Sequence, residues 1–132
     1  MQMIITEVAS MSKIKVNVWG RDFELPVLYE CREGQELLQH QKDAAKLFLE
    51  SDALKNPTQV MKYVVTNNSE DVAGRTDNIF RFVIPRQIYV MRKEETNCVA
   101  LICNYKFDPE HGLAILYENG NITHIGAEDI LG

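Results

Sequence analysis

Two hydrophobic periodicities divide the chain. Over residues 13–30 apolar positions alternate with polar ones, as they do in strands that bury one face. A turn at Gly20 in the middle of this segment predicts a β-hairpin. The apolar spacing then changes to that of an amphipathic helix, and we expect helices over about 35–51 and about 57–67.

After these helices the pattern predicts a polar loop and then a run of strands. Residues 98–107 are apolar on both faces, which is typical of a central strand. Asn119-Gly120 between two apolar runs indicates a type I′ hairpin turn. The expected segments are the loop 67–78 and strands over 79–84, 87–92, 98–107, 113–117 and 122–125.

Because the helices are segregated between hairpin-linked strands, the sequence predicts an α+β fold. We expect an antiparallel sheet with an N-terminal β-hairpin, two central helices packed on one face and a C-terminal β-meander. The 132 residues are expected to form a single domain over 1–132, with residues 1–11 as a poorly ordered and least essential extension.

Composition and charge narrow the classes of function. Hydrophobic residues make up 45% and charged residues 25%, and no apolar run is long enough for a membrane span, so we expect no membrane partner. The net charge is -5, and residues 108–132 hold five acidic residues and no Lys or Arg. Such a surface repels phosphate, which disfavours nucleic acid and favours a basic protein or a divalent cation as partner. The alternative interpretation is a solvated acidic rim without a partner.

The cysteine content favours a reducing compartment. Three cysteines, Cys31, Cys98 and Cys103, leave one over in any pairing, so we expect a cytoplasmic protein. Cys98 and Cys103 are five positions apart, which puts them on opposite faces of a strand and prevents them from chelating one metal ion together.

The densest polar cluster follows the expected central strand. Asp108, Glu110 and His111 lie within one short segment, and Glu128 and Asp129 join them if residues 107–129 fold as consecutive antiparallel strands. One interpretation is a strand-connecting turn, in which Gly112 takes a positive φ. The other is a binding site, formed by two carboxylates and an imidazole with their acidic neighbours.

Other polar residues are weaker candidates. We expect His124 to be packed opposite Ile115, if the pairing continues backwards from the Asn119-Gly120 turn. Arg75, Asp77 and Arg86 are polar residues in or near the loop region, and nothing around them specifies a reaction.

The C-terminal third resembles a known family. The segments FDPEHGLAI at 107–115 and IGAEDI at 125–130 are similar to those of a family of uncharacterised bacterial domains, and the likeness reaches upstream to the hairpin around Phe23. Because that family has no established function, the resemblance implies no catalytic residue and no cofactor. Small bacterial α+β domains of this kind sometimes resemble immunity proteins that guard against contact-delivered toxins, which is an analogy of fold alone.

Two classes of function remain open. The first is a non-catalytic protein-binding module that docks a basic partner through Asp108, Glu110, His111, Glu128 and Asp129. The second is a metal-dependent hydrolase, or another enzyme, that uses Asp108, Glu110 and His111. The chain has no standard nucleotide-binding, hydrolase or metalloprotease motif, so the first class is favoured and no metal or cofactor is expected. The sequence leaves open whether the chain forms a homo-oligomer.

Overall fold

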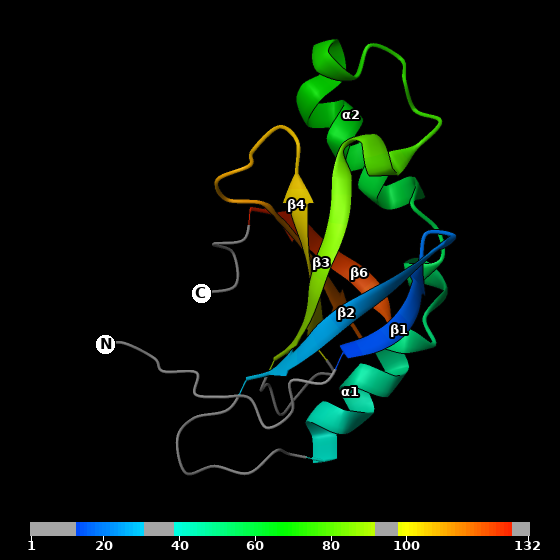
Figure 1. The fold of residues 1–132 in the computed structure, drawn as a ribbon, viewed down its shortest axis with the longest axis vertical. Helices are drawn as coiled ribbons and strands as arrows, with labels where there is room; N and C mark the ends of the chain where they lie inside the picture. Colours follow the sequence, from blue (N-terminus) through cyan, green and yellow to red (C-terminus); the bar gives the residue numbers. More distant parts are fainter. Residues whose placement is uncertain (1–12, 31–38, 92–97, 128–132) are drawn as a thin grey trace.

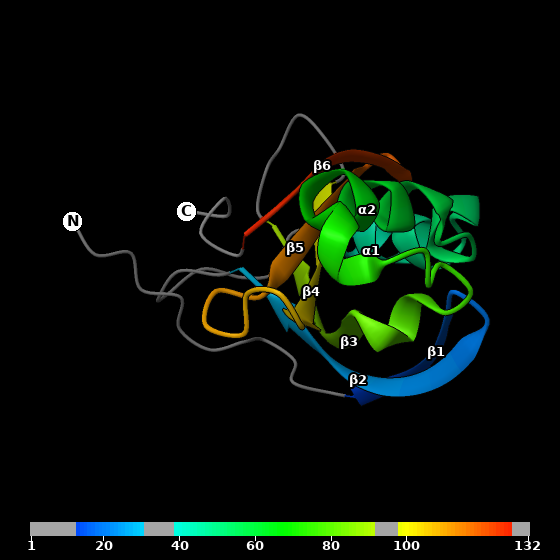
Figure 2. The same ribbon diagram turned by 90° about the horizontal axis from the view of Figure 1, so that it is seen from above.

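A computed structural model describes residues 13–30, 39–91 and 98–127 (Figure 1). Its six strands form one sheet, in which each strand lies beside its neighbours in the sequence. Figure 2 shows the two helices gathered on one side of this sheet. The strands are β1 (Lys13–Val18), β2 (Arg21–Tyr29), β3 (Val83–Val90), β4 (Cys98–Tyr105), β5 (Leu113–Glu118) and β6 (Asn121–Gly126), and the helices are α1 (Gln39–Leu49) and α2 (Thr58–Val72). The predicted α+β fold is confirmed.

The sheet is mixed, whereas the sequence predicted an antiparallel one. β1 and β2 form the predicted hairpin, and β3 to β6 form an antiparallel meander. Between these two units β2 and β3 run parallel, with Val27 opposite Ile88. Parallel neighbours require a long connection, and the segment that contains α1 and α2 supplies it.

The sequence predicted two strands, over 79–84 and 87–92, but the structure has a short helix followed by a single strand in this region. Ile79–Arg81 is a short 3₁₀ helix, η2, which begins where the Asn78 side chain accepts a hydrogen bond from the Phe80 amide at 3.0 Å. β3 then continues through Pro85 to Val90 as one strand with a bulge between Pro85 and Gln87. Proline cannot donate to the ladder, so the bulge accommodates it without ending the strand.

Helix α2 extends further than predicted, because residues up to Val72 are helical where a loop from 67 was expected. At Asn68 the backbone leaves helical geometry with φ of -143°, which kinks the helix. The Asn68 amide donates to the Tyr105 hydroxyl at 2.7 Å, and Val72 beyond the kink is buried. These tertiary contacts hold a polar segment in a helix that composition alone disfavours. For the first helix, residues 35–38 lie outside the described part, as do residues 1–11.

Strand β4 is the predicted central strand. Val99, Leu101 and Cys103 belong to the core under the helices, together with Phe48 of α1. Ala100 and Ile102 face the other way and are also buried, at 0% and 3% exposed. Burial on both faces explains why this strand lacks the polar alternation seen in the hairpin.

A buried glutamine closes the parallel pair. Gln41 of α1 is fully buried, and its amide nitrogen donates to the Glu30 carbonyl at 2.8 Å and to the Val90 carbonyl at 3.5 Å. The Glu30 amide in turn donates to the Val90 carbonyl at 2.9 Å. Because β2 and β3 end at these residues, Gln41 ties the first turns of α1 to both strands.

Leu101→Ala tests the position of the central strand. Removing a fully buried side chain from β4 leaves a cavity, so we expect the free energy of unfolding to fall by about 2–5 kcal/mol. Urea titration measures the change. A loss below about 1 kcal/mol would contradict the placement of Leu101 in the core.

Gln41→Met tests the closure of the parallel pair. Methionine fills a similar volume but removes the donor to the Glu30 carbonyl and the longer hydrogen bond to the Val90 carbonyl, so we expect a loss of about 1–3 kcal/mol in the free energy of unfolding. Gln39→Met is the matched control, because Gln39 is exposed and its side chain bonds only Asp43 among the described contacts. Equal losses from the two substitutions would contradict the role given to Gln41.

Candidate functional site

The segment from Asp108 to Gly112 is a tight turn held by its own hydrogen bonds. The Gly112 amide donates to the Asp108 carbonyl at 2.8 Å, and Gly112 has φ of 66°, the positive value expected from the sequence. Oδ1 of Asp108 accepts from the His111 amide at 3.1 Å and lies 3.1 Å from Nδ1 of the same residue. The Asp108 carboxylate therefore builds the turn.

The three candidate side chains of this turn differ in their surroundings. The Asp108 and His111 side chains are 37% and 55% exposed, and they contact each other. Glu110 is exposed and makes no hydrogen bond or ion pair with the described residues. Of the three, Glu110 is the carboxylate presented to solvent without a structural task.

Strand pairing places this turn beside the end of β6. Ala114 at the start of β5 is opposite Gly126 at the end of β6. In both views the red end of β6 lies beside the orange turn between β4 and β5 (Figures 1 and 2). Glu128 and Asp129 lie outside the described residues, and they follow Gly126 by two and three positions in the sequence.

Three aromatic side chains pack together beneath the turn, and two of them come directly before it in the chain. Phe107 stacks on Phe82 with ring centroids 5.6 Å apart and meets the edge of Tyr105 at 5.7 Å. Burial is the main cause that raises the pKa of Tyr105 to about 12, with further contributions from Tyr63 and Asp108, while the hydrogen bond from Asn68 acts in the opposite direction. The Tyr105 hydroxyl is therefore neutral in the ordinary pH range. Local sequence patterns do not indicate this support, because the Asn68 contact joins segments far apart in the chain.

The alternative function, a metal-dependent enzyme, requires several ligating side chains that lie close together. The described residues contain no group of three or more His, Cys, Asp or Glu side chains placed to hold a metal ion. Cys98 and Cys103 are buried on opposite faces of β4, as their spacing predicted. Cys31 lies outside the described residues.

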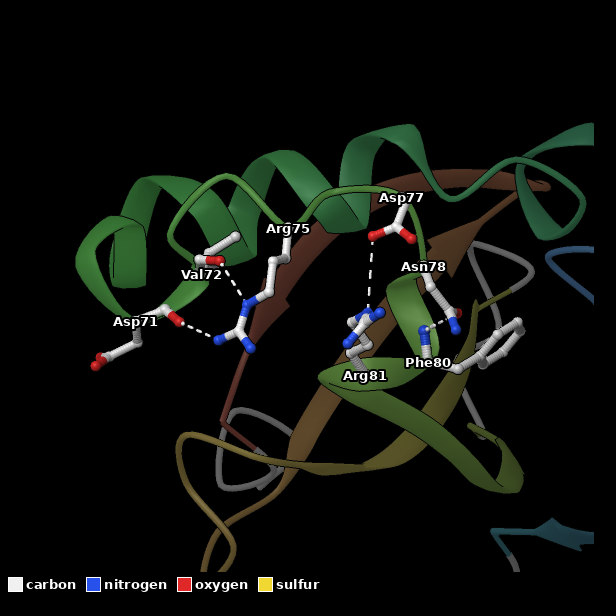
Figure 3. A network of polar contacts seen from close by, with 7 residues as sticks. All are labelled: Asp71, Val72, Arg75, Asp77, Asn78, Phe80 and Arg81. Atoms are coloured by element: carbon white, nitrogen blue, oxygen red, sulfur yellow. Dashed lines mark hydrogen bonds and ion pairs between the residues drawn. The ribbon is translucent and has the colours of Figure 1, made fainter.

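The other polar candidates mostly maintain the fold. Figure 3 shows Arg75 at the end of α2, where its guanidinium donates to the carbonyls of Val72 and Asp71 at 3.3 and 3.2 Å. Asp77 forms an exposed ion pair of 3.7 Å with Arg81. The Arg86 guanidinium donates to Asn104 across the β3–β4 pair at 3.3 Å.

The structure also shows a shallow groove that the sequence did not indicate. It measures about 500 Å³ and lies between α2 and the residues that lead to η2. Pro57, Met61, Val65 and Ile79 are its apolar lining residues, and Lys62 and Asp77 are its charged ones. Such a groove forms only when α2 and the returning chain pack together, so local sequence patterns do not reveal it.

The prediction for His124 is wrong. A register shift between Leu116 and Tyr117 places His124 opposite Leu116 instead of Ile115, and the side chain is exposed. The expected pairing holds next to the turn, where Glu118 is opposite Asn121. A bulge of one residue moves every later side chain to the other face, and the turn sequence does not specify it.

A model described as "Domain of unknown function (DUF6985)" matches residues 5–132. The chain belongs to this family. The match includes both segments on which the resemblance in the sequence was based. No match was found among curated proteins or among solved structures. No helix in the described part has the length and apolar character that crossing a membrane requires.

Asp108→Ala tests whether this carboxylate holds the turn. Alanine removes the acceptor for the His111 amide, so we expect the free energy of unfolding to fall by about 1 kcal/mol in a urea titration. Asp108→Asn keeps an oxygen acceptor and should stay close to the wild type. An Asp108→Ala variant with the same free energy of unfolding as the wild type would contradict the role of Asp108 in holding the turn.

Proposed function

We propose that this chain is a non-catalytic protein-binding module that docks a basic partner through the acidic end of its sheet. The pairing of Ala114 with Gly126 carries the proposal, because it brings the turn containing Asp108 and Glu110 next to the strand that leads to Glu128 and Asp129. Carboxylates gathered at one end of a sheet create a negative potential that attracts a basic surface.

The contacts within the turn support binding over catalysis. The Asp108 carboxylate is engaged with the amide and ring of His111, which gives a rigid turn that presents Glu110 to solvent. A rigid, preformed surface reduces the entropy lost when a partner binds. His111 contributes to this surface as the residue that fixes Asp108.

The proposed partner is a protein with a basic surface. Residues 108–132 contain no Lys or Arg, so a complementary surface is rich in these residues. A basic toxin domain has this chemistry, which is the class of partner that the immunity-protein analogy suggests, and the encounter would take place in the bacterial cytoplasm. Such a complex should be sensitive to salt, because exposed charges are screened within about 8–10 Å at physiological ionic strength.

Site-specific crosslinking in the host cell tests the proposal. A photoreactive amino acid at position 110 should capture a basic protein, whereas the same group at exposed Gln59 on α2 should not. Equal capture from both positions, or capture of an acidic protein at position 110, would contradict the proposed surface.

The captured protein then allows a quantitative prediction. Glu110→Gln should weaken binding to the purified partner about two- to fivefold, with a larger effect at low salt, because we expect this exposed charge to contribute about 0.4–1 kcal/mol, the upper part of the range for exposed ion pairs. Glu70→Gln on α2 is the matched control, since it removes the same charge from another exposed site. Isothermal titration calorimetry measures both. An affinity that Glu110→Gln leaves unchanged would show that the acidic end is not the docking surface.

A further inference from the structure

Strand β6 is an outer strand of the sheet. It pairs with β5 on one side, and the described residues place no strand on its other side. An outer strand presents backbone N–H and C=O groups that can pair with another chain.

The hairpin turn fixes the direction of these groups. Asn119 and Gly120 have φ of 53° and 85°, as in the predicted type I′ turn, so the flanking pair Glu118–Asn121 is hydrogen-bonded. Antiparallel pairs alternate, and the N–H and C=O of Ile122 in the next pair point away from β5.

A bulge interrupts the alternation once. Leu116 is opposite His124 and Tyr117 is opposite Ile122, which leaves Thr123 as the extra residue. Ile115 and Ile125 then form the next pair whose backbone groups point outward. No backbone hydrogen bond from another described element reaches Ile122 or Ile125. Because the bulge breaks a long regular register, this edge suits a short extended segment.

The two outer strands of the sheet differ in their side chains. β1 carries exposed Lys13 and Lys15, and lysines on an outer strand discourage pairing with other chains. β6 has no charged residue and no proline, and Thr123 and His124 are exposed on it. Carboxylates lie near both ends of β6. Glu118 precedes the hairpin turn at one end, and at the other end Gly126 is opposite Ala114, which follows the turn that contains Glu110.

We propose that a short, basic, extended segment of a partner protein adds to the sheet along β6. Backbone groups of Ile122 or Ile125 pair with the segment, while its Lys or Arg side chains reach Glu118 at one end and Glu110 at the other. This inference deepens the proposed function and rests on it, because it specifies how the basic partner docks. Strand addition of this kind gives affinity through main-chain hydrogen bonds and specificity through side chains.

Charge favours a basic partner over a second copy of the chain. Antiparallel pairing of two β6 strands about a twofold axis places the Glu118 end of each copy beside the acidic turn of the other. Both ends are negative, so the two copies repel each other there. A basic segment has favourable charge contacts at the same two places.

The test uses a defined probe, an end-capped octapeptide of alternating Lys and Val, titrated into the ¹⁵N-labelled full chain. We expect amide shift changes to be concentrated in residues 121–126 and in the turn at 108–112. A peptide with N-methyl groups on alternate amides keeps its charge but cannot pair, and it should bind at least about tenfold more weakly, the effect of about 1.4 kcal/mol. An alternating Glu–Val peptide should not bind.

Two variants of the chain complete the test. His124→Lys places an edge-protecting charge on β6 at an exposed position and should weaken the Lys–Val peptide at least about fivefold. Gln59→Lys adds the same charge on exposed α2 and is the matched control. An unchanged amide spectrum away from the substituted residue shows that each variant is folded.

Several results would overturn strand addition at β6. One is that the Lys–Val peptide does not bind, or binds no better than its N-methylated form. Another is that the amide shift changes lie away from β6. A third is a dimer, seen in light scattering, that His124→Lys disrupts. If Glu110→Gln and salt weaken binding of the captured partner, while N-methylation does not change binding of the peptide, docking at the acidic end is supported and strand addition is wrong. If N-methylation and His124→Lys weaken binding of the peptide, while Glu110→Gln and salt do not change binding of the captured partner, strand addition is supported and docking at the acidic end is wrong.

Discussion

The parallel contact between β2 and β3 determines the arrangement of the rest of the molecule. A hairpin can join antiparallel strands directly, but parallel neighbours need a crossover. This crossover contains both helices, which lie on one side of the sheet (Figure 2). Gln41 donates to the carbonyls of Glu30 and Val90 where the two strands end, so the first turns of α1 are tied to the contact that makes the crossover necessary.

The segment that follows α1 holds the turn of the β5–β6 hairpin, and the opposite end of the hairpin lies next to the β4–β5 turn. The Ser51 hydroxyl, which follows α1, donates to the Gly120 carbonyl in the hairpin turn. Phe48 meets the edge of the buried Tyr117 with ring centroids 4.9 Å apart. The opposite end of the same hairpin lies beside the acidic turn, where Glu110 is exposed. The packing thus holds the turn of this hairpin against α1 and the residues that follow it.

Short-range patterns predicted much of this fold, and long-range contacts account for most of what they missed. Alternation indicated the first hairpin, Asn119-Gly120 the second, and burial on both faces identified β4. The parallel β2–β3 contact joins segments about sixty positions apart, so periodicity within either strand does not encode it. The helical geometry of residues 67–72 depends on Asn68 reaching Tyr105, and the exposure of His124 depends on a bulge.

The candidate site was predicted in its local part. Asp108, Glu110 and His111 do form one turn, because proline and glycine in the sequence specify it. The support from Tyr105 and Phe107 and the outer position of β6 among the described strands required the assembled sheet, since they depend on which strands are neighbours. The grouping of Glu128 and Asp129 with this turn stays a prediction, as these residues lie outside the described part.

We have proposed that electrostatic attraction at the acidic end brings a basic partner to this sheet. Stopped-flow measurement of the association rate constant with the captured partner, at increasing ionic strength, tests it most directly. The account predicts a steep fall in the association rate with salt and a nearly constant dissociation rate, because screening acts on the encounter. An association rate that does not change with ionic strength would contradict it.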